Sequence, residues 1–262
     1  MLLKDKVVII SGIGPGLGVK LAVEAAREGA RALAIGARTA EKLDDAERRI
    51  REVNGACRVL KALTDIRDAA QCGRLAESAK KEFGRVDGLI NSAFFWGAPS
   101  TADSADLAGW KAVLDTNLIG TMQMTQAVVP IMKAHGGGAI VNISTMATIK
   151  PHTGEAGYAA SKGALNVVTK YLAHELGPSN IRVNVVRMGW MDGAPVRGYL
   201  AHAAKEQGVP EKQLYDAVAA NVALCRIVTD DECARAALFM VSDYASAVTG
   251  AMLDVNGGEA MP

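Results

Sequence analysis

The stretch "KVVIISGIGPGLGVKLAVEAAREGA", residues 6–30, decides the fold. It begins with β-branched residues, passes through four closely spaced glycines and continues as a helical pattern that stops at Gly29. We predict a strand over 6–11, a tight loop over 11–18 and a helix over 17–30. The loop glycines let the main chain approach a pyrophosphate, and the helix amides then face its negative charge. These candidate cofactor-binding residues are Gly12, Gly14, Gly16 and Gly18.

Short β-branched runs alternate with helical patterns along the rest of the chain. Further strands are predicted over 31–36, 57–63, 86–91, 138–144, 181–187 and 251–255. Helices are predicted over 40–55, 68–83, 106–134, 155–177 and 230–242. Repeated strand–helix–strand units indicate an α/β fold: one doubly wound, Rossmann-type domain over 1–262, with a seven-stranded, mostly parallel sheet and helices on both faces. The rhythm breaks at about 190–225, which we interpret as an irregular or helical substrate lid.

Composition excludes several classes of function. The net charge of +1, with acidic and basic residues interleaved, argues against nucleic acid as a partner. No apolar run is long enough to span a bilayer, and the N-terminal residues lack the layout of a signal peptide. The four cysteines have no metal-like spacing, so we expect no metal site and reduced thiols in a cytoplasmic protein. They are Cys57, Cys72, Cys225 and Cys233.

A candidate proton-transfer site lies in "NISTMATIKPHTGEAGYAASKGA", residues 142–164. Tyr158 and Lys162 are four residues apart and share one face of a predicted helix. A phenol titrates near pH ~10, and a nearby ammonium group lowers that pKa toward a value useful for general acid–base catalysis. The preceding strand ends in two hydroxyl residues, Ser144 and Thr145, at the edge of the sheet where ligands bind in such folds.

The end of the second predicted strand bears on the choice of dinucleotide. A carboxylate there would bind the ribose 2′-hydroxyl of NAD and repel the 2′-phosphate of NADP. The sequence instead reads "AIGARTAEKL", with Arg38 after the strand and no acid at its end. A guanidinium can pair with a 2′-phosphate, so we expect NADP in preference to NAD.

Together these motifs resemble the classical short-chain dehydrogenase/reductase family over essentially the whole chain. The glycine spacing Gly12-x3-Gly16-x-Gly18 is similar to that of the family. In the family the catalytic hydroxyl stands thirteen residues before the tyrosine, which selects Thr145 where serine is usual. Strand alternation would turn Ser144 the other way, and Ser144 is kept as the alternative.

The resemblance implies further roles for single residues. Asp65 would contact the adenine amino group, and Asn117 would hold a water that links the lysine to solvent. Asn91, in "INSAF", and Gly189, in "RVNVVRMGW", match positions at the cofactor. Lys162 would bind the nicotinamide ribose as well as tune the tyrosine.

Several positions depart from the family pattern. Pro15 stands where NADP-dependent relatives often carry a basic residue. Ser92 and Phe94 replace an asparagine and a glycine after the fourth strand. Met188 replaces a proline, and Gly193 replaces the threonine near the nicotinamide amide.

The implied activity is hydride transfer between a nicotinamide dinucleotide and a secondary alcohol or ketone. Apolar side chains placed near the cleft predict a bulky or cyclic, steroid- or terpenoid-like small molecule: Phe94, Phe95, Trp96, Met146, Met188, Trp190, Met191 and Tyr199. Two alternatives stay open, a 3-oxoacyl thioester reductase and a non-catalytic dinucleotide-sensing protein. An enoyl reductase is disfavoured because that branch spaces its tyrosine and lysine more widely. The resemblance also implies a homo-oligomer, a tetramer or dimer packed through 106–134 and 155–177.

Overall fold

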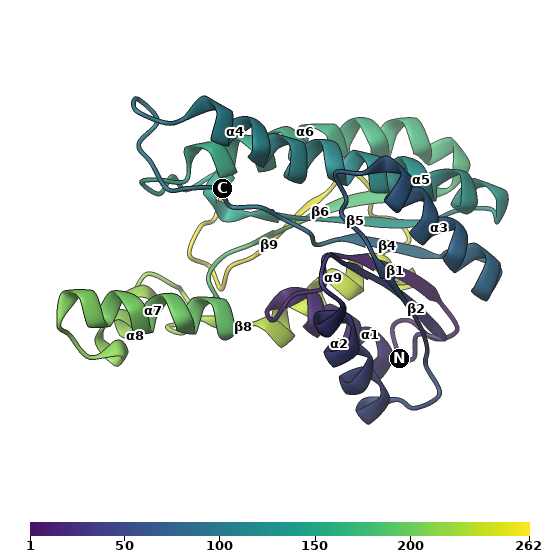
Figure 1. The fold of residues 1–262 in the computed structure, drawn as a ribbon, viewed down its shortest axis with the longest axis horizontal. Helices are drawn as coiled ribbons and strands as arrows, with labels where there is room; N and C mark the ends of the chain where they lie inside the picture. Colours follow the sequence, from purple (N-terminus) through teal and green to yellow (C-terminus); the bar gives the residue numbers. More distant parts are fainter.

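The computed structural model describes residues 1–262 and has one seven-stranded parallel sheet at its centre (Figure 1). The strand order is β3-β2-β1-β4-β5-β6-β9, and every neighbouring pair is parallel. The strands are β1 (Val7–Ser11), β2 (Ala32–Ala37), β3 (Arg58–Leu63), β4 (Gly88–Asn91), β5 (Gly138–Thr145), β6 (Ile181–Met188) and β9 (Met252–Val255). The chain reverses its direction of winding between β1 and β4, and ligands bind at such a switch point in doubly wound folds. The predicted fold class is confirmed.

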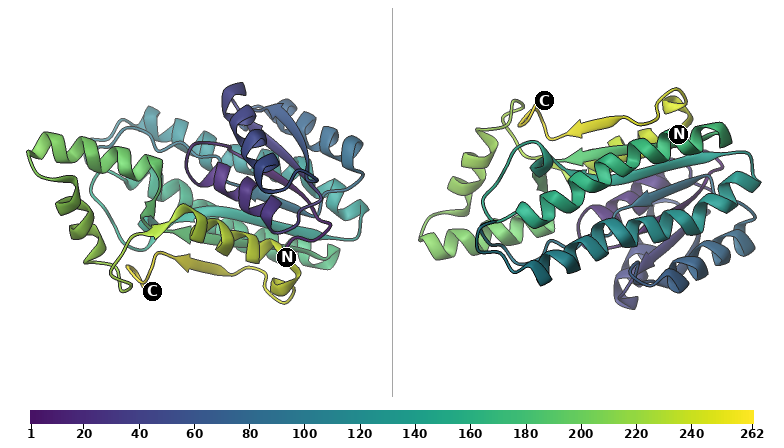
Figure 2. Two further views of the ribbon diagram at one scale, coloured as in Figure 1. Left: turned by 90° about the horizontal axis from the view of Figure 1, so that it is seen from below. Right: turned by 90° about the horizontal axis from the view of Figure 1, so that it is seen from above.

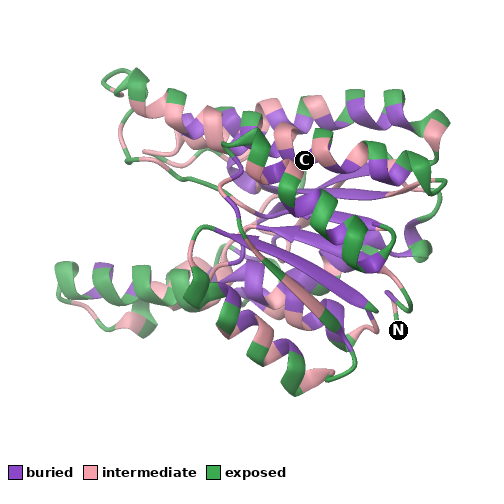
Figure 3. Cartoon of the chain, turned by 45° about the vertical axis from the view of Figure 1, so that its right-hand side comes forward, coloured by how far each residue is buried: buried purple, intermediate pink, exposed green.

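Helices cover both faces of the sheet (Figures 1 and 2). One face carries α1 (Leu17–Arg27), α2 (Ala40–Val53) and α9 (Asp230–Val241). The other carries α3 (Ala69–Phe83), α4 (Leu107–Leu114), α5 (Thr121–Ala134) and α6 (Ala156–Leu176). Side chains alternate between the two cores: Val8 and Ile10 pack toward α1, whereas Val7 and Ile9 pack toward α3. The central strands β1, β2, β4, β5 and β6 are therefore buried on both sides, as the purple centre of Figure 3 shows, whereas the edge strands β3 and β9 are more exposed.

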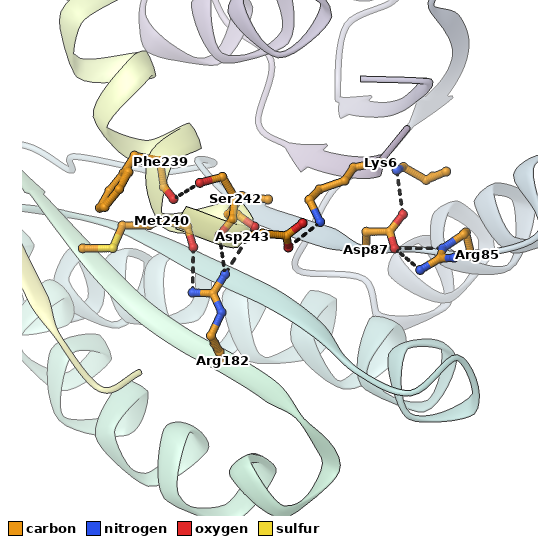
Figure 4. Close-up of polar contacts among 10 residues, drawn as sticks. Lys6, Arg85, Asp87, Arg182, Phe239, Met240, Ser242 and Asp243 are labelled. Atoms are coloured by element: carbon orange, nitrogen blue, oxygen red, sulfur yellow. Dashed lines mark hydrogen bonds and ion pairs between the residues drawn. The ribbon is translucent and has the colours of Figure 1, made fainter. Parts of the chain in front are cut away.

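Paired polar groups join the elements at the amino-terminal edge of the sheet (Figure 4). Arg182 donates to the carbonyl oxygens of Met240 and Ser242, both at 3.0 Å, at the C-terminal end of α9. Lys6 pairs with Asp243 at 2.7 Å, and the Asp87 carboxylate accepts the Val7 N–H at 2.8 Å. These contacts tie the starts of β1 and β6 to the C-terminal end of α9.

Two elements differ from the sequence prediction. The predicted helix over 106–134 is interrupted by a π-helical turn, Asp115–Gly120, between α4 and α5. A second, two-stranded sheet joins β7 (Met191–Asp192) to β8 (Val228–Thr229). Strands of two residues carry no readable periodicity, and a π turn depends on tertiary packing, so neither is visible in the sequence.

The segment predicted as a lid contains two helices, α7 (Ala194–Gln207) and α8 (Glu211–Ala219). They project beyond the carboxyl edge of the sheet and form the green arm in Figures 1 and 2. None of the helices of the chain combines the length and hydrophobicity that crossing a bilayer requires.

Candidate active site

A cleft of about 540 Å³ lies at the carboxyl edge of the sheet. Its walls come from the glycine loop, the ends of β2 to β6, helix α6 and the start of α7. This volume is in the range of small-molecule and cofactor sites. Most predicted site residues line it: Gly12, Gly14, Gly16, Gly18, Arg38, Asp65, Thr145, Tyr158, Lys162 and Gly189. Asn91 and Asn117 do not.

The glycine loop is shaped for close approach of a phosphate group. Gly12 has φ +94°, and a side chain there would overlap the main chain of Ala93. Helix α1 begins after Gly16 with no side-chain cap and no acidic residue in its first turn. Its N-terminal amides are therefore available to an anion, so the loop fits the pyrophosphate of a dinucleotide.

Lys162 lies four residues after Tyr158, the candidate catalytic tyrosine, and is almost fully buried. Its side chain is on α6, and its ammonium nitrogen donates to the Ile143 carbonyl oxygen at 2.8 Å. Burial lowers the pKa of Lys162 to about 8. Burial also raises the pKa of Tyr158 above its ordinary value, and the Glu155 carboxylate adds to that shift. The pKa of Tyr158 is thus raised rather than lowered, opposite to the direction that the spacing predicts.

The two hydroxyl candidates lie in different environments. Thr145 ends β5, is half-buried, and its Oγ1 accepts the Ala147 N–H at 3.2 Å. Ser144 is 2% exposed and its Oγ has no hydrogen-bond partner. Both residues line the cleft. Thr145 is the more exposed of the two, whereas Ser144 is almost fully buried.

Asn117 lies in the π turn, where it is fully buried. Its Oδ1 accepts the Phe95 N–H at 2.7 Å, and its Nδ2 donates to the Phe95 carbonyl oxygen at 2.9 Å. The same Nδ2 donates to Ser161 Oγ at 2.9 Å, on α6 next to Lys162. Asn117 therefore joins the loop after β4 to the helix that carries the tyrosine and lysine.

Asn91 lies below the floor of the cleft in a buried polar network. It accepts from Ser11 Oγ at 3.2 Å and donates to Asn142 Oδ1 at 2.9 Å and to Thr125 Oγ1 at 3.2 Å. Its side chain thus ties β1, β4 and β5 together beneath the residues that line the cleft, Ser92 and Ala93.

At the far end of the cleft, cationic side chains lie around the ends of β2 and β3. Arg38 and Lys42 line the cleft with Thr39, whose hydroxyl makes no cap bond to α2. Asp65 pairs with Arg67 at 2.6 Å, and this guanidinium holds the pKa of Asp65 below its usual range. The local charge is therefore positive.

The known proteins most informative about this chain are oxidoreductases. The family described as enoyl-(acyl carrier protein) reductase matches residues 12–259. The chain is 33% identical over 257 residues to 3alpha-hydroxysteroid dehydrogenase of Mediterraneibacter gnavus, covering 98% of both chains. The chain belongs to the short-chain dehydrogenase/reductase family. This makes it an NAD(P)-dependent alcohol dehydrogenase or ketone reductase.

Another sequence relative and two solved structures are also oxidoreductases. FabG, a 3-oxoacyl-[acyl-carrier-protein] reductase of Thermotoga maritima, is 32% identical over 262 residues, covering 98% of this chain and 99% of its own. L-sorbose reductase from Gluconobacter frateurii, solved with NADPH and L-sorbose, is 29% identical with a TM-score of 0.92 and coverage of 99% and 98%. NAD⁺-bound xylitol dehydrogenase is 27% identical with a TM-score of 0.89 and coverage of 98% and 100%.

The apolar residues predicted near the substrate of this short-chain dehydrogenase are only partly at the cleft. Phe94, Met188 and Met191 line it, and the Phe94 ring centroid is 6.2 Å from that of Tyr158. Trp190 packs on Tyr199 at 5.8 Å between ring centroids. Five residues of the predicted set do not line the cleft: Phe95, Trp96, Met146, Trp190 and Tyr199. Met146 is buried.

Sequence reasoning missed several residues that line the cleft of this dehydrogenase. Lys42 and Arg67 could have been found as cations near the ends of predicted strands. Pro195 and Asp230 come from the lid and from the start of α9, and no sequence signal connects those segments to the glycine loop. No group of three or more His, Cys, Asp or Glu side chains is arranged to hold a metal ion.

Proposed function

We propose that this short-chain dehydrogenase interconverts a secondary alcohol and a ketone with Tyr158 as the general acid and base. One observation carries the proposal: Tyr158, Lys162 and Thr145 line the same cleft as an uncapped, glycine-lined helix N-terminus. A nicotinamide dinucleotide bound there would supply or accept the hydride.

The protein residues would align the reactants and move one proton. In ketone reduction the neutral Tyr158 hydroxyl donates its proton to the developing alkoxide, and in alcohol oxidation the Tyr158 phenolate accepts the proton of the alcohol. The Thr145 hydroxyl donates a hydrogen bond to the same oxygen. Lys162, held by the Ile143 carbonyl, favours the phenolate that remains after proton donation. Asn117 fixes the loop beside the ring of Tyr158 and is proposed to complete the path to solvent.

NADP is proposed as the preferred dinucleotide, with NAD as the alternative. Arg38 and Lys42 are the supporting residues, because both line the cleft beyond the end of β2 and no acidic residue ends that strand. A guanidinium and an ammonium group there would pair with a 2′-phosphate.

The proposed substrate is a bulky or cyclic, apolar secondary alcohol or ketone. The exposed aromatic loop over 94–96, of which Phe94 is 60% exposed, supports this class, as does the similarity to a hydroxysteroid dehydrogenase. Helices α7 and α8 are proposed as the substrate lid. The FabG similarity keeps 3-oxoacyl thioesters as the second candidate, and cofactor binding without turnover would indicate a sensing protein.

We propose a cytoplasmic homo-oligomer, a tetramer or a dimer. Its support is the set of exposed apolar side chains on the helical layer over α4 to α6: Leu107, Ile119, Val167 and Tyr171. The three interior cysteines and the exposed Cys225 are all unpaired, which is consistent with a reducing compartment.

The function is tested by following the loss of NADPH or NADH with a panel of ketones. Cyclic and steroidal ketones, small aliphatic ketones and acetoacetyl thioesters form the three arms. We expect turnover of the cyclic ketones with NADPH. Turnover of acetoacetyl thioesters alone would favour the reductase of acyl thioesters.

A further inference from the structure

Asp230, the first residue of α9, has a buried carboxyl group without a protein partner. The residue is 3% exposed and lines the dinucleotide cleft. Its two acidic neighbours are both engaged: Asp231 pairs with Lys20 at 2.9 Å, and Glu232 forms the capping box with Thr229 and pairs with Arg226. No protein group donates a hydrogen bond to its carboxyl oxygens, and these oxygens keep access to the cleft, where a bound ligand can supply the donor.

The carboxyl group of Asp230 occupies the space of a side chain at position 193. Any carbon added to Gly193 would overlap the Asp230 carboxyl oxygens. Gly193 has φ −142°, an extended conformation open to every residue, so Asp230 and not the backbone requires glycine there. Pairing of β7 with β8 places Asp192 opposite Thr229 and thereby brings the two positions together.

The same carboxyl group lies beside the glycine loop. Its Oδ2 is 3.7 Å from the position of a side-chain carbon on Gly16, the residue that precedes α1. The Asp230 carboxyl group therefore lies between Gly193, which precedes the lid helix α7, and the glycine loop that fits a pyrophosphate.

We infer that the Asp230 carboxyl group is a direct hydrogen-bonding contact of the bound dinucleotide, supplied from α9 in the space that a side chain at position 193 would fill. The inference rests on the part of the proposed function that places a nicotinamide dinucleotide in this cleft. The chemical role is that of an acceptor, because a carboxyl oxygen can accept a hydrogen bond from an amide or hydroxyl group of the dinucleotide.

The charged groups around Asp230 act in opposite directions. Burial raises its pKa, and Asp231 and Asp192 add to that effect, whereas the Lys20 ammonium lowers it. The N-terminus of α9 also favours the carboxylate. A carboxyl oxygen that can accept is present in both protonation states, so the contact does not depend on which one binds.

The test measures the Kd of NADPH by fluorescence titration and that of NADP⁺ by calorimetry, with thermal unfolding and limited proteolysis of the lid in parallel. The variants are Asp230→Ala, Asp230→Asn and the matched control Asp231→Asn, one residue along the same helix. A fourth variant, the swap, combines Gly193→Thr with Asp230→Ala. It removes the carboxyl group and places a threonine hydroxyl in the same space, from position 193 next to the lid.

We expect Asp230→Ala to weaken binding roughly tenfold or more, as loss of a hydrogen bond to a charged group does. Asp230→Asn, which keeps an acceptor oxygen, should lose less, Asp231→Asn should bind as the wild type, and the swap should recover part of the affinity. An Asp230→Ala protein with the Kd of the Asp231→Asn control would overturn the inference. So would weaker binding that appears only with faster cleavage of the lid and is not recovered by the swap. Failure of the wild type to bind either dinucleotide would instead contradict the proposed function.

Discussion

Asn117 forms two hydrogen bonds with the main chain of Phe95: its Oδ1 accepts the Phe95 N–H at 2.7 Å, and its Nδ2 donates to the Phe95 carbonyl oxygen at 2.9 Å. This pair joins the π turn to the aromatic loop next to Tyr158. The π turn therefore fixes the position of this loop. Such turns are frequent at functional sites.

Replacing Asn117 with alanine should leave two main-chain groups of Phe95 without partners. We expect the free energy of unfolding to fall by about 1–3 kcal/mol, measured by urea denaturation. Ser161→Ala is the control, because it removes the bond between Asn117 Nδ2 and Ser161 Oγ, together with the bond from Ser161 Oγ to the Tyr158 carbonyl oxygen, and leaves both Phe95 contacts in place. Equal stability of the two variants would show that the Phe95 contacts contribute nothing.

The sequence predicts the scaffold better than it predicts the contacts across it. Seven strands and their flanking helices follow from alternation and helical period, because burial on both faces demands those patterns. The π turn that positions Asn117 leaves no such pattern. Asp230 and Gly193 are about 37 residues apart in the sequence and are brought together by the pairing of β7 with β8, two strands of two residues each. Local sequence therefore cannot reveal this contact. Only part of the predicted set of apolar residues lines the cleft, because an apolar side chain can pack in the core as well as line a cleft.

The choice between the two hydroxyls can be decided by a pair of isosteric changes. Thr145→Val keeps the shape of the side chain and removes the hydroxyl, so we expect kcat to fall about 10²- to 10³-fold, as for other lost oxyanion donors. Ser144→Ala should leave kcat close to that of the wild type. Steady-state ketone reduction measures both, and the reverse ranking would move the catalytic role to Ser144.

Burial of Lys162 predicts a rise in stability with pH. Its pKa is about 8 in the folded chain against 10.5 for the free group, so the unfolded chain binds more protons between these values. The free energy of unfolding should therefore increase as the pH rises through this window, by up to roughly 3 kcal/mol.

Lys162→Met provides the comparison for this effect. The variant cannot titrate at this position, so its stability relative to the wild type should be greatest below pH ~8 and should decline above it. Urea denaturation across the window measures the difference. A difference that does not change with pH would show that burial leaves the lysine pKa unshifted.

Dinucleotide preference should depend on Arg38. Arg38→Ala should weaken NADP⁺ binding roughly 10- to 100-fold and leave NAD⁺ binding nearly unchanged, because only NADP⁺ carries the 2′-phosphate. Arg74→Ala, an exposed arginine of α3 outside the cleft, is the control. Equal weakening of both dinucleotides by Arg38→Ala would contradict the proposed preference.

The most direct test of the account is the Tyr158→Phe variant, assayed for NADPH oxidation with the best ketone of the panel and for NADPH affinity in the same preparation. Loss of the general acid should reduce kcat about 10²- to 10⁴-fold while the Kd of NADPH stays unchanged, because the hydroxyl acts on the substrate oxygen. A variant that still reduces the ketone at the wild-type rate would contradict the central claim that Tyr158 moves the proton.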